Sequence, residues 1–249
     1  MDYQIILVLL AVGLIAGCLN TLAGGGSLLA LPVLMIFLGL PHNVANATNR
    51  VAIVLQNIFA VLGFKSKGVS AYPFNVWLGI SAFFGAIVGA FLAVDIDREV
   101  FNKILAFVIV GVVIYMAINP LKYFKKEENT SKKATLTSII IFFFIGIYGG
   151  FIQAGVGYLM IMALTLVNGF SLVKTNSIKV FVALTYTSVA LAIFIYYDII
   201  NWEFGIPLAL GQAVGGWLSS RWSVKLGDKW IRYFVMVTAS AFAIKLFFF

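Results

Sequence analysis

Residues 20–32 read NTLAGGGSLLALP and lie inside an apolar stretch that runs from about residue 5 to about residue 40. Three consecutive glycines followed by a proline predict a break in a helix that would otherwise cross a membrane. Non-helical backbone survives at membrane depth only where it is buried in protein or lines an aqueous cavity. The free N–H groups at the start of a half-helix also favour anions. This segment therefore predicts a binding site for a small anion.

The composition of the whole chain is that of an integral membrane protein. Of its 249 residues, 62% are hydrophobic and only 10% are charged, whereas about a quarter are charged in soluble domains. Several apolar runs approach the roughly 20 residues that a spanning helix needs. The net charge of +8 comes from Lys and Arg at the ends of those runs, which indicates membrane topology rather than nucleic-acid binding. We expect a multi-pass protein of the cell (plasma or inner) membrane.

Few residues in the sequence could carry catalytic or metal chemistry. Cys18 is the single cysteine and His42 the single histidine, which excludes an intrachain disulfide and argues against a Cys- or His-based metal site. Apart from Glu203 at the very start of one run, the apolar runs contain no Asp or Glu, so no buried carboxylate pair is available for acid–base catalysis. We therefore predict no enzyme activity, no cofactor and no bound metal. The start of the chain, with Asp2 and no basic residue, does not predict a cleaved signal peptide.

The two halves of the chain resemble each other. GLIAGCLNTLAGG and GIYGGFIQAGVGY share two spaced glycines, an amide residue and a Gly-rich break. Several such matches in the same order indicate an internal duplication. The matching segments are 13–25 with 146–158, 47–54 with 174–181, and 82–92 with 209–219. We predict a first transmembrane repeat over residues 1–120, a cytoplasmic linker over 121–135 and a second transmembrane repeat over 136–249.

The charges of the loops predict that the two repeats are inverted relative to each other. In the first half, the loop near 65–70 carries lysines and the loop at 95–99 is mainly acidic. In the second half, the loop at 198–203 is acidic and the segment 219–232 is mainly basic. The linker at 121–133, with five lysines, is expected in the cytoplasm. Equivalent loops therefore lie on opposite sides of the membrane, as in transporters with inverted repeats.

Inverted repeats require each half to cross the membrane an odd number of times. Each half has three plain spans, at 47–64, 72–94 and 100–119, and at 175–197, 203–219 and 229–249. The first unit of each half must then be a pair of arms that folds back at the glycine break. The alternative is a single broken helix that crosses, which would place the basic segment 219–232 outside. We predict an all-α integral membrane bundle, an inverted repeat in which each half has a broken or re-entrant helix pair and three transmembrane helices, with both termini outside.

Polar residues at the two breaks and at the starts of two equivalent helices form the candidate site. Arg50 and Lys179 lie within apolar sequence, next to the Thr-Asn pairs at 48–49 and 175–176. An intramembrane cation is costly and usually faces a cavity or a partner. We predict that the substrate is bound by Asn20, Gly24, Gly25, Gly26, Ser27, Thr48, Asn49, Arg50, Gln153, Gly157, Thr175, Asn176 and Lys179. Two alternatives stay open: the glycines only permit close helix packing, and the cations only snorkel to the headgroups.

Four segments of the sequence are similar to those of a known membrane protein family. These are AGCLNTLAGGGSLLALPVL (16–34), ATNR (47–50), KTNSIKV (174–180) and GQAVGGWLSSRWSVKLGDKWIRYFVMV (211–237). They resemble the TauE/SafE family, also called the sulfite exporter family. The resemblance implies transport of a small sulfur-containing or organic anion, such as sulfite, sulfoacetate or another sulfonate. QAGVGYLMIM at 153–162 departs from the pattern because it has only spaced glycines and no proline, so the second half would contribute less to the pocket.

The sequence thus predicts a membrane transporter that exports a small anion by alternating access, with the lipid bilayer and the anion as its partners and no nucleic acid. An anion channel with the same cations and a continuous pore is the alternative. A membrane enzyme and a scaffold protein are the remaining classes, and the scaffold would bind no anion. The identity of the anion, the coupling ion and the oligomeric state stay open, and a homo-oligomer is compatible with the sequence.

Overall fold

The computed structural model describes residues 2–97, 99–101, 103–104, 107, 110–111 and 127–248, with the backbone alone at 232 and 234–248. The span predicted over 100–119 lies largely outside these residues, as does the linker from 121 to 126. Within the described ranges all regular secondary structure is helical, which confirms the predicted all-α class.

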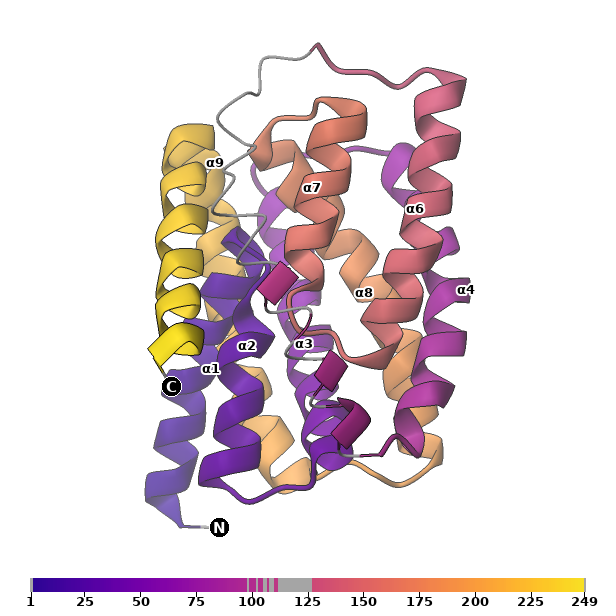
Figure 1. Cartoon of the computed structure of the whole chain (residues 1–249). Helices are drawn as coiled ribbons and strands as arrows, with labels where there is room; N and C mark the ends of the chain where they lie inside the picture. Colours follow the sequence, from indigo (N-terminus) through magenta and orange to yellow (C-terminus); the bar gives the residue numbers. More distant parts are fainter. Residues whose placement is uncertain are drawn as a thin grey trace.

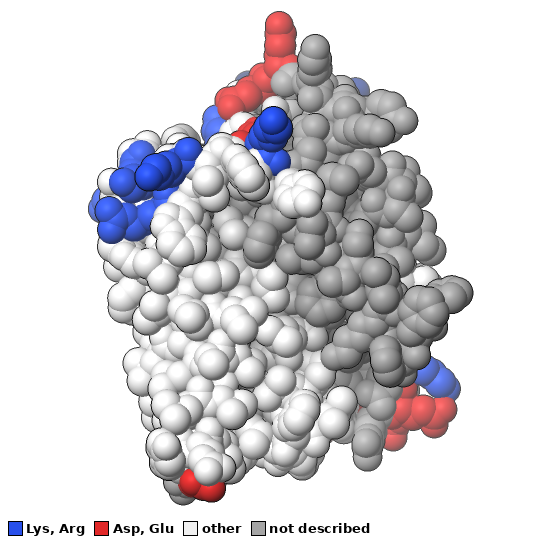
Figure 2. Space-filling view, turned by 90° about the vertical axis from the view of Figure 1, so that its left-hand side faces the viewer, with Lys and Arg blue, Asp and Glu red and all other residues white. Residues whose placement is uncertain are grey.

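Five of the described helices are long and apolar enough to cross a membrane. They are α1 (Tyr3–Leu22), α3 (His42–Lys65), α4 (Phe74–Val94), α6 (Lys132–Phe151) and α8 (Leu172–Tyr196). Large apolar side chains point outward from them, and Phe84 and Phe144 are 56% and 62% exposed. On the face shown in Figure 2, a broad uncharged region separates charged side chains at the two ends of the molecule. This is the surface that a bilayer requires of a multi-pass protein.

At each predicted glycine break the chain folds back on itself (Figure 1). α1 is followed by α2 (Gly26–Pro32) and the π-helical turn η1 (Val33–Phe37), and α6 is followed by α7 (Val156–Asn168). At 1.5 Å per residue, the two return segments are about 18 Å and about 20 Å long, short of the roughly 30 Å hydrocarbon core. Each half therefore opens with a long helix and a short return helix, as the pairing of two arms predicts.

Glycines bring pairs of helices into direct backbone contact. α1 packs along α9 (Trp202–Phe248), and α6 packs along α4. The contacts are Gly13 with Leu208, Gly17 with Gln212, Gly146 with Ala82 and Gly150 with Ala86. A Cβ atom at any of these glycines would collide with the neighbouring backbone, so these spaced glycines serve close helix packing.

Helix α9 differs from the prediction in one place. The sequence predicts a loop over 219–232, whereas the helix continues to Leu226 and only Gly227 leaves helical geometry, with φ 74° and ψ −180°. The segment SSRWSVKL at 219–226 contains neither glycine nor proline, so nothing in it interrupts the helix. Beyond Gly227 the second arm of α9 runs back toward the end of the molecule where the chain begins (Figure 1).

Helices α3 and α8 are neighbours and run in opposite directions (Figure 1). Together they carry most of the buried polar side chains of the described structure, namely Asn46, Thr48, Asn49, Arg50, Gln56, Asn57, Thr175, Asn176, Ser177, Lys179 and Thr187. Polar side chains in spanning helices turn toward the protein interior because hydrocarbon cannot satisfy their hydrogen bonds. The pair therefore places a polar centre inside an apolar bundle.

Candidate functional site

The two glycine breaks meet at the centre of the molecule. Gly24, in a left-handed conformation with φ +88°, lies against the backbone of Gly157, and a Cβ atom on either residue would collide with the other. The neighbouring Gly25 lies against the side chain of Tyr158. Because the backbones of Gly24 and Gly157 touch in this conformation, a bound ligand must lie beside this pair rather than between its two members.

Amide and hydroxyl side chains surround the first break. The Asn20 amide donates a hydrogen bond of 2.8 Å to Oε1 of Gln56. The Asn49 amide donates to Oγ of Ser27 at 3.1 Å, and Nε2 of Gln212 donates to Oδ1 of Asn49 at 3.4 Å. Three predicted site residues, Asn20, Ser27 and Asn49, are thus brought into one polar cluster by helices α1, α2, α3 and α9.

Lys179 reaches this cluster from α8. Its Nζ donates to the backbone carbonyl of Thr21 at 2.9 Å, and the neighbouring Asn176 amide donates to the carbonyl of Leu22 at 3.0 Å. Both carbonyls are at the C-terminal end of α1. An ammonium group has three N–H donors, and the described structure provides one acceptor for them. Lys179, only 2% exposed, therefore keeps donor capacity inside the protein.

Arg50 lies at the second break and is far better paired. Its guanidinium donates to the carbonyl of Gly149, to that of Gly150 at 3.0 Å and to Oε1 of Gln153. A longer bond of 3.4 Å reaches Oδ1 of Asn46. The two glycine carbonyls belong to the C-terminal end of α6. The geometry makes Arg50 a cap of that helix end.

Each of the two cations therefore binds the backbone of the half of the chain to which it does not belong. Arg50, from the first half, binds carbonyls of α6 in the second half, and Lys179, from the second half, binds a carbonyl of α1 in the first. Helix C-termini carry a partial negative charge that favours cations. Arg50 is 0% and Lys179 is 2% exposed, and both point at backbone inside the protein. The snorkelling alternative is thus wrong for both residues.

The remaining predicted residues are distributed unevenly around these clusters. Thr48 accepts a hydrogen bond of 3.0 Å from the backbone N–H of Asn201, just before α9, and so contacts that loop. Asn46, which the sequence does not single out, donates to the carbonyl of Phe151 at 2.7 Å and bonds Arg50. Its position four residues before Arg50 is the signal that could have identified it, because residues at that spacing share a helix face.

Several buried polar atoms have no hydrogen-bond partner among the described residues. The donors are Nε of Arg50 and Nδ2 of Asn57, and the acceptors and hydroxyl groups include Oδ1 of Asn176, Oε1 of Gln212 and Oγ1 of Thr175. Buried polar groups are nearly always paired, so unpaired ones indicate water or a ligand. Within the described ranges no carboxylate is buried and no cluster of His, Cys, Asp and Glu could hold a metal ion. The unpaired donors and the Thr175 hydroxyl group suit an anion, whereas the unpaired amide oxygens of Asn176 and Gln212 only accept hydrogen bonds and suit water.

Known membrane transporter proteins are similar to this chain over nearly its full length. A family model described as "Sulfite exporter TauE/SafE" matches residues 9–246. The "Probable membrane transporter protein ORF9" of Sinorhizobium sp is 23% identical over 98% of this chain and 93% of its own length. The "Probable membrane transporter protein YfcA" of Escherichia coli K12 is 27% identical over 96% of this chain and 88% of its own length. No solved structure matches.

Proposed function

The chain belongs to the sulfite exporter TauE/SafE family of membrane transporters, and on that premise we propose that it exports a small sulfur-containing or organic anion, such as sulfite, sulfoacetate or another sulfonate. The family assignment confirms the resemblance read from the sequence, and it makes the protein a multi-pass membrane transporter rather than an enzyme. The substrate, the direction of transport and the residues that bind the substrate are the content of the proposal.

The observation that best supports this proposal is that two cations are buried among the described residues while no carboxylate is. Lys179 and Arg50 each bring a positive charge into the centre of the bundle, while no Asp or Glu is buried among the described residues. The helix ends that they contact offset only part of this charge, because a helix dipole amounts to about half an elementary charge. An anion held beside Lys179 would supply the rest. The donor capacity left on Lys179 suits its oxygen atoms, and the unpaired Nδ2 of Asn57, next to Gln56 on α3, is a further buried donor.

The proposed substrate position is beside the first glycine break. Lys179, Asn20, Ser27 and Asn49 gather there. Thr175 lies nearby on α8 with an unpaired hydroxyl group that can donate, beside Asn176, whose amide donates to the carbonyl of Leu22. Arg50 and Gln153 hold the tip of α6 in place on the other side of the contact between the glycines. In this proposal both halves supply side chains to the pocket, and the first half adds the triple glycine that only this half contains.

The proposed inverted repeat is supported by equivalent contacts in the two halves. Gly211 lies against the carbonyl of Leu10 and Gly215 against that of Leu14. In the same way, Gly85 lies against the carbonyl of Phe143 and Gly89 against that of Ile147. The sequence matches pair these residues with one another, helix for helix. In addition, α1 begins at the lower end of Figure 1 and α6 at the upper end, as opposite orientations of the halves require.

The orientation in the membrane can be tested with the one native cysteine removed. In a Cys18→Ser background, a cysteine introduced at Lys65 is expected to resist a membrane-impermeant thiol reagent applied outside cells. A cysteine introduced at Glu203 is expected to react, because α9 begins at the acidic end and basic segments stay in the cytoplasm. Both positions are exposed. Labelling of Lys65→Cys alone from outside would contradict the proposed orientation, and labelling of both cysteines from the same side would contradict the inverted arrangement.

The membrane potential favours the export of an anion. With a negative cytoplasm, a monovalent anion that leaves the cell gains about 2.3 kcal/mol per 100 mV. Export in this proposal needs no coupling ion, and the absence of buried carboxylates from the described residues accords with it, since proton relays use such groups. Uptake would need coupling to Na⁺ or H⁺.

The experiment that tests the function is thermal unfolding of the purified protein with a panel of small anions. Sulfite, sulfate, sulfoacetate and acetate would be compared with zwitterionic taurine at equal ionic strength. At 100 times its Kd, a ligand stabilises by about 2.7 kcal/mol. We expect sulfite or sulfoacetate to raise the unfolding temperature. If none of the panel anions does so beyond the effect of chloride, the proposed substrate class is wrong.

Transport in proteoliposomes separates the carrier from the anion channel. Alternating access exposes one site to one side at a time, so uptake of labelled anion should saturate and should accelerate when unlabelled anion is loaded inside. A channel would show neither counterflow nor saturation at the same concentrations. Conductance that rises linearly with anion concentration would favour the channel.

A further inference from the structure

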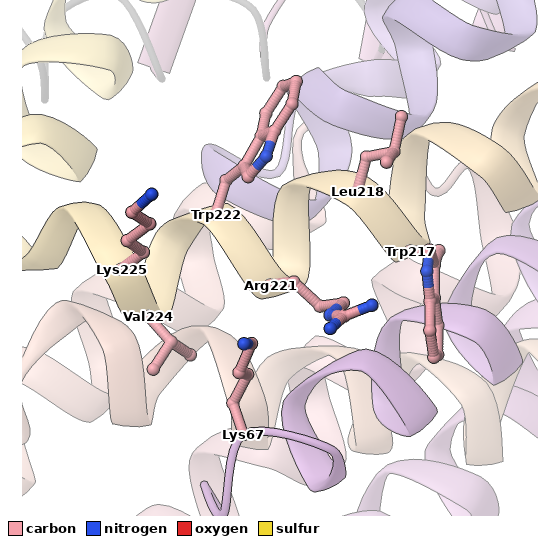
Figure 3. Close-up of a pocket in the computed structure, with 7 residues that line it drawn as sticks. All are labelled: Lys67, Trp217, Leu218, Arg221, Trp222, Val224 and Lys225. Carbon is pink, nitrogen blue, oxygen red and sulfur yellow. The ribbon is translucent and has the colours of Figure 1, made fainter.

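A pocket of about 340 Å³ opens at the basic end of the bundle, away from the central site. It lies between the first arm of α9 and the residues that follow α3. Figure 3 shows Lys67 reaching from that segment toward α9, with Arg221 beside it and the Trp217 ring next to Arg221. The guanidinium carbon of Arg221 is 5.2 Å from the centre of the Trp217 ring. Lys225 and Trp222 complete the polar and aromatic part of the lining.

The described lining contains three cations and no carboxylate. In the described part of the chain, ion pairs join Lys103 with Glu99 and Lys174 with Glu128, and none involves Lys67, Arg221 or Lys225. Asp228, the nearest acidic residue along α9, accepts a hydrogen bond of 3.0 Å from the backbone N–H of Val173. Three like charges around one hollow repel each other, so the pocket attracts an anion.

The corresponding place in the first half shows that the fold itself does not need these cations. The register that pairs Gly85 with Gly211 places Asp95 opposite Arg221 and Glu99 opposite Lys225. The same helix end thus carries acidic residues in one half and basic residues in the other. A topology signal alone would require basic residues at this end of the bundle, but it would not gather Lys67 and Arg221 from two elements around one pocket.

An apolar stripe leads from the pocket along the lipid-facing side of α9. Leu210, Val214, Leu218 and Trp222 follow each other at intervals of four residues and share one face of the helix. Leu210, Val214 and Trp222 are 52%, 51% and 55% exposed. A cationic pocket joined to an exposed apolar stripe matches a molecule with a phosphate group and an acyl chain. We propose that this pocket binds the phosphate group of an anionic phospholipid from the cytoplasmic leaflet, with an acyl chain along α9.

Lipid binding to the detergent-purified full chain tests the proposal. Native mass spectrometry or titration with a fluorescent lipid would compare phosphatidylglycerol with zwitterionic phosphatidylcholine. Each of Lys67→Gln and Arg221→Gln should weaken phosphatidylglycerol binding about fivefold, since a basic residue near an anionic headgroup contributes about that factor, and phosphatidylcholine binding should stay unchanged. Lys65→Gln is the matched control, because it removes an exposed charge two residues from Lys67 and outside the pocket.

Three results would overturn the proposal. Equal phosphatidylglycerol affinity in the wild type, Lys67→Gln and Arg221→Gln would exclude the pocket as the lipid site. A loss in Lys65→Gln equal to that in Lys67→Gln would show that only total charge matters. Inorganic phosphate that binds as tightly as phosphatidylglycerol, with the same dependence on Lys67, would mean that the pocket takes a soluble phosphate and no lipid. None of these readings depends on the proposed transport function.

Discussion

Replacing Lys179 by methionine is expected to abolish anion binding and reduce transport about 100-fold, because losing one partner of a buried charge pair costs roughly 2–5 kcal/mol, without lowering the stability of the protein. Lys179 is 2% exposed, and its ammonium group has one hydrogen bond, to the carbonyl of Thr21. A buried charge with so little compensation opposes folding, and replacing buried ionic groups by apolar ones is often neutral or stabilising by about 1–4 kcal/mol. Methionine has a similar length and no charge, so it fills the same space.

Arg50→Met should behave in the opposite way. Its guanidinium pairs with the carbonyls of Gly149 and Gly150 and with Gln153 and Asn46. Removing it leaves several buried acceptors unpaired, at about 1–3 kcal/mol each. We therefore expect a loss of about 3 kcal/mol or more in the free energy of unfolding.

Thermal unfolding with and without sulfite or sulfoacetate measures both variants. Lys174→Met is the control for Lys179→Met, because Lys174 lies on the same helix and forms a partly exposed ion pair with Glu128 at 2.6 Å. It should leave anion binding intact. If an anion stabilises Lys179→Met as much as the wild type, Lys179 is only a helix cap and the proposed site is wrong.

Gly24→Ala is expected to destabilise the protein by about 3 kcal/mol or more. Two effects combine there: the positive φ of +88° costs a residue with a side chain roughly 1–2 kcal/mol, and the new Cβ collides with the backbone of Gly157. Backbone cannot move aside as a flexible side chain can, so overpacking at this point adds a further 1–3 kcal/mol or so.

Two matched variants separate these effects in the same unfolding assay. Gly39 has φ +67° and open space around it, so Gly39→Ala reports the conformational cost alone. Gly157 meets Gly24 without a positive φ, so Gly157→Ala reports the collision alone. The expected order of destabilisation is Gly24→Ala first and Gly39→Ala last. A Gly24→Ala protein as stable as Gly39→Ala would mean that the central contact is not closed in the native state.

The glycine pattern allowed much of the fold to be predicted from the sequence. Spacing by four residues in Gly13 and Gly17, and again in Gly85 and Gly89, is visible in the chain and becomes helix contact in the structure. The triple glycine at 24–26 correctly predicted that the first helix ends and the chain turns back. The partner of each glycine-rich face could not be predicted, because the pattern shows that a helix can be approached closely but does not show by which helix.

The candidate site was predictable in its residue types and less so in its connections. Arg50 and Lys179 stand out because charge is rare in apolar runs, yet the acceptors they use are backbone carbonyls, which every residue has. No side-chain pattern can reveal such a partner. Thr48 was selected for its place beside Asn49, but neighbouring residues on a helix point about 100° apart. It therefore contacts the loop before α9 instead.

The contact between Gly24 and Gly157 also limits how the two halves can diverge in sequence. Elsewhere in a bundle, a larger residue on one helix can be accommodated when its neighbour becomes smaller. Glycine has no smaller replacement, so neither member of this pair can grow at the other's expense. Lipid-facing positions such as Phe84 and Val214 have no such restriction. After a duplication, substitutions would thus accumulate at the periphery and be blocked at the centre, so this pair of glycines is expected to persist in both halves while the lipid-facing residues around it change.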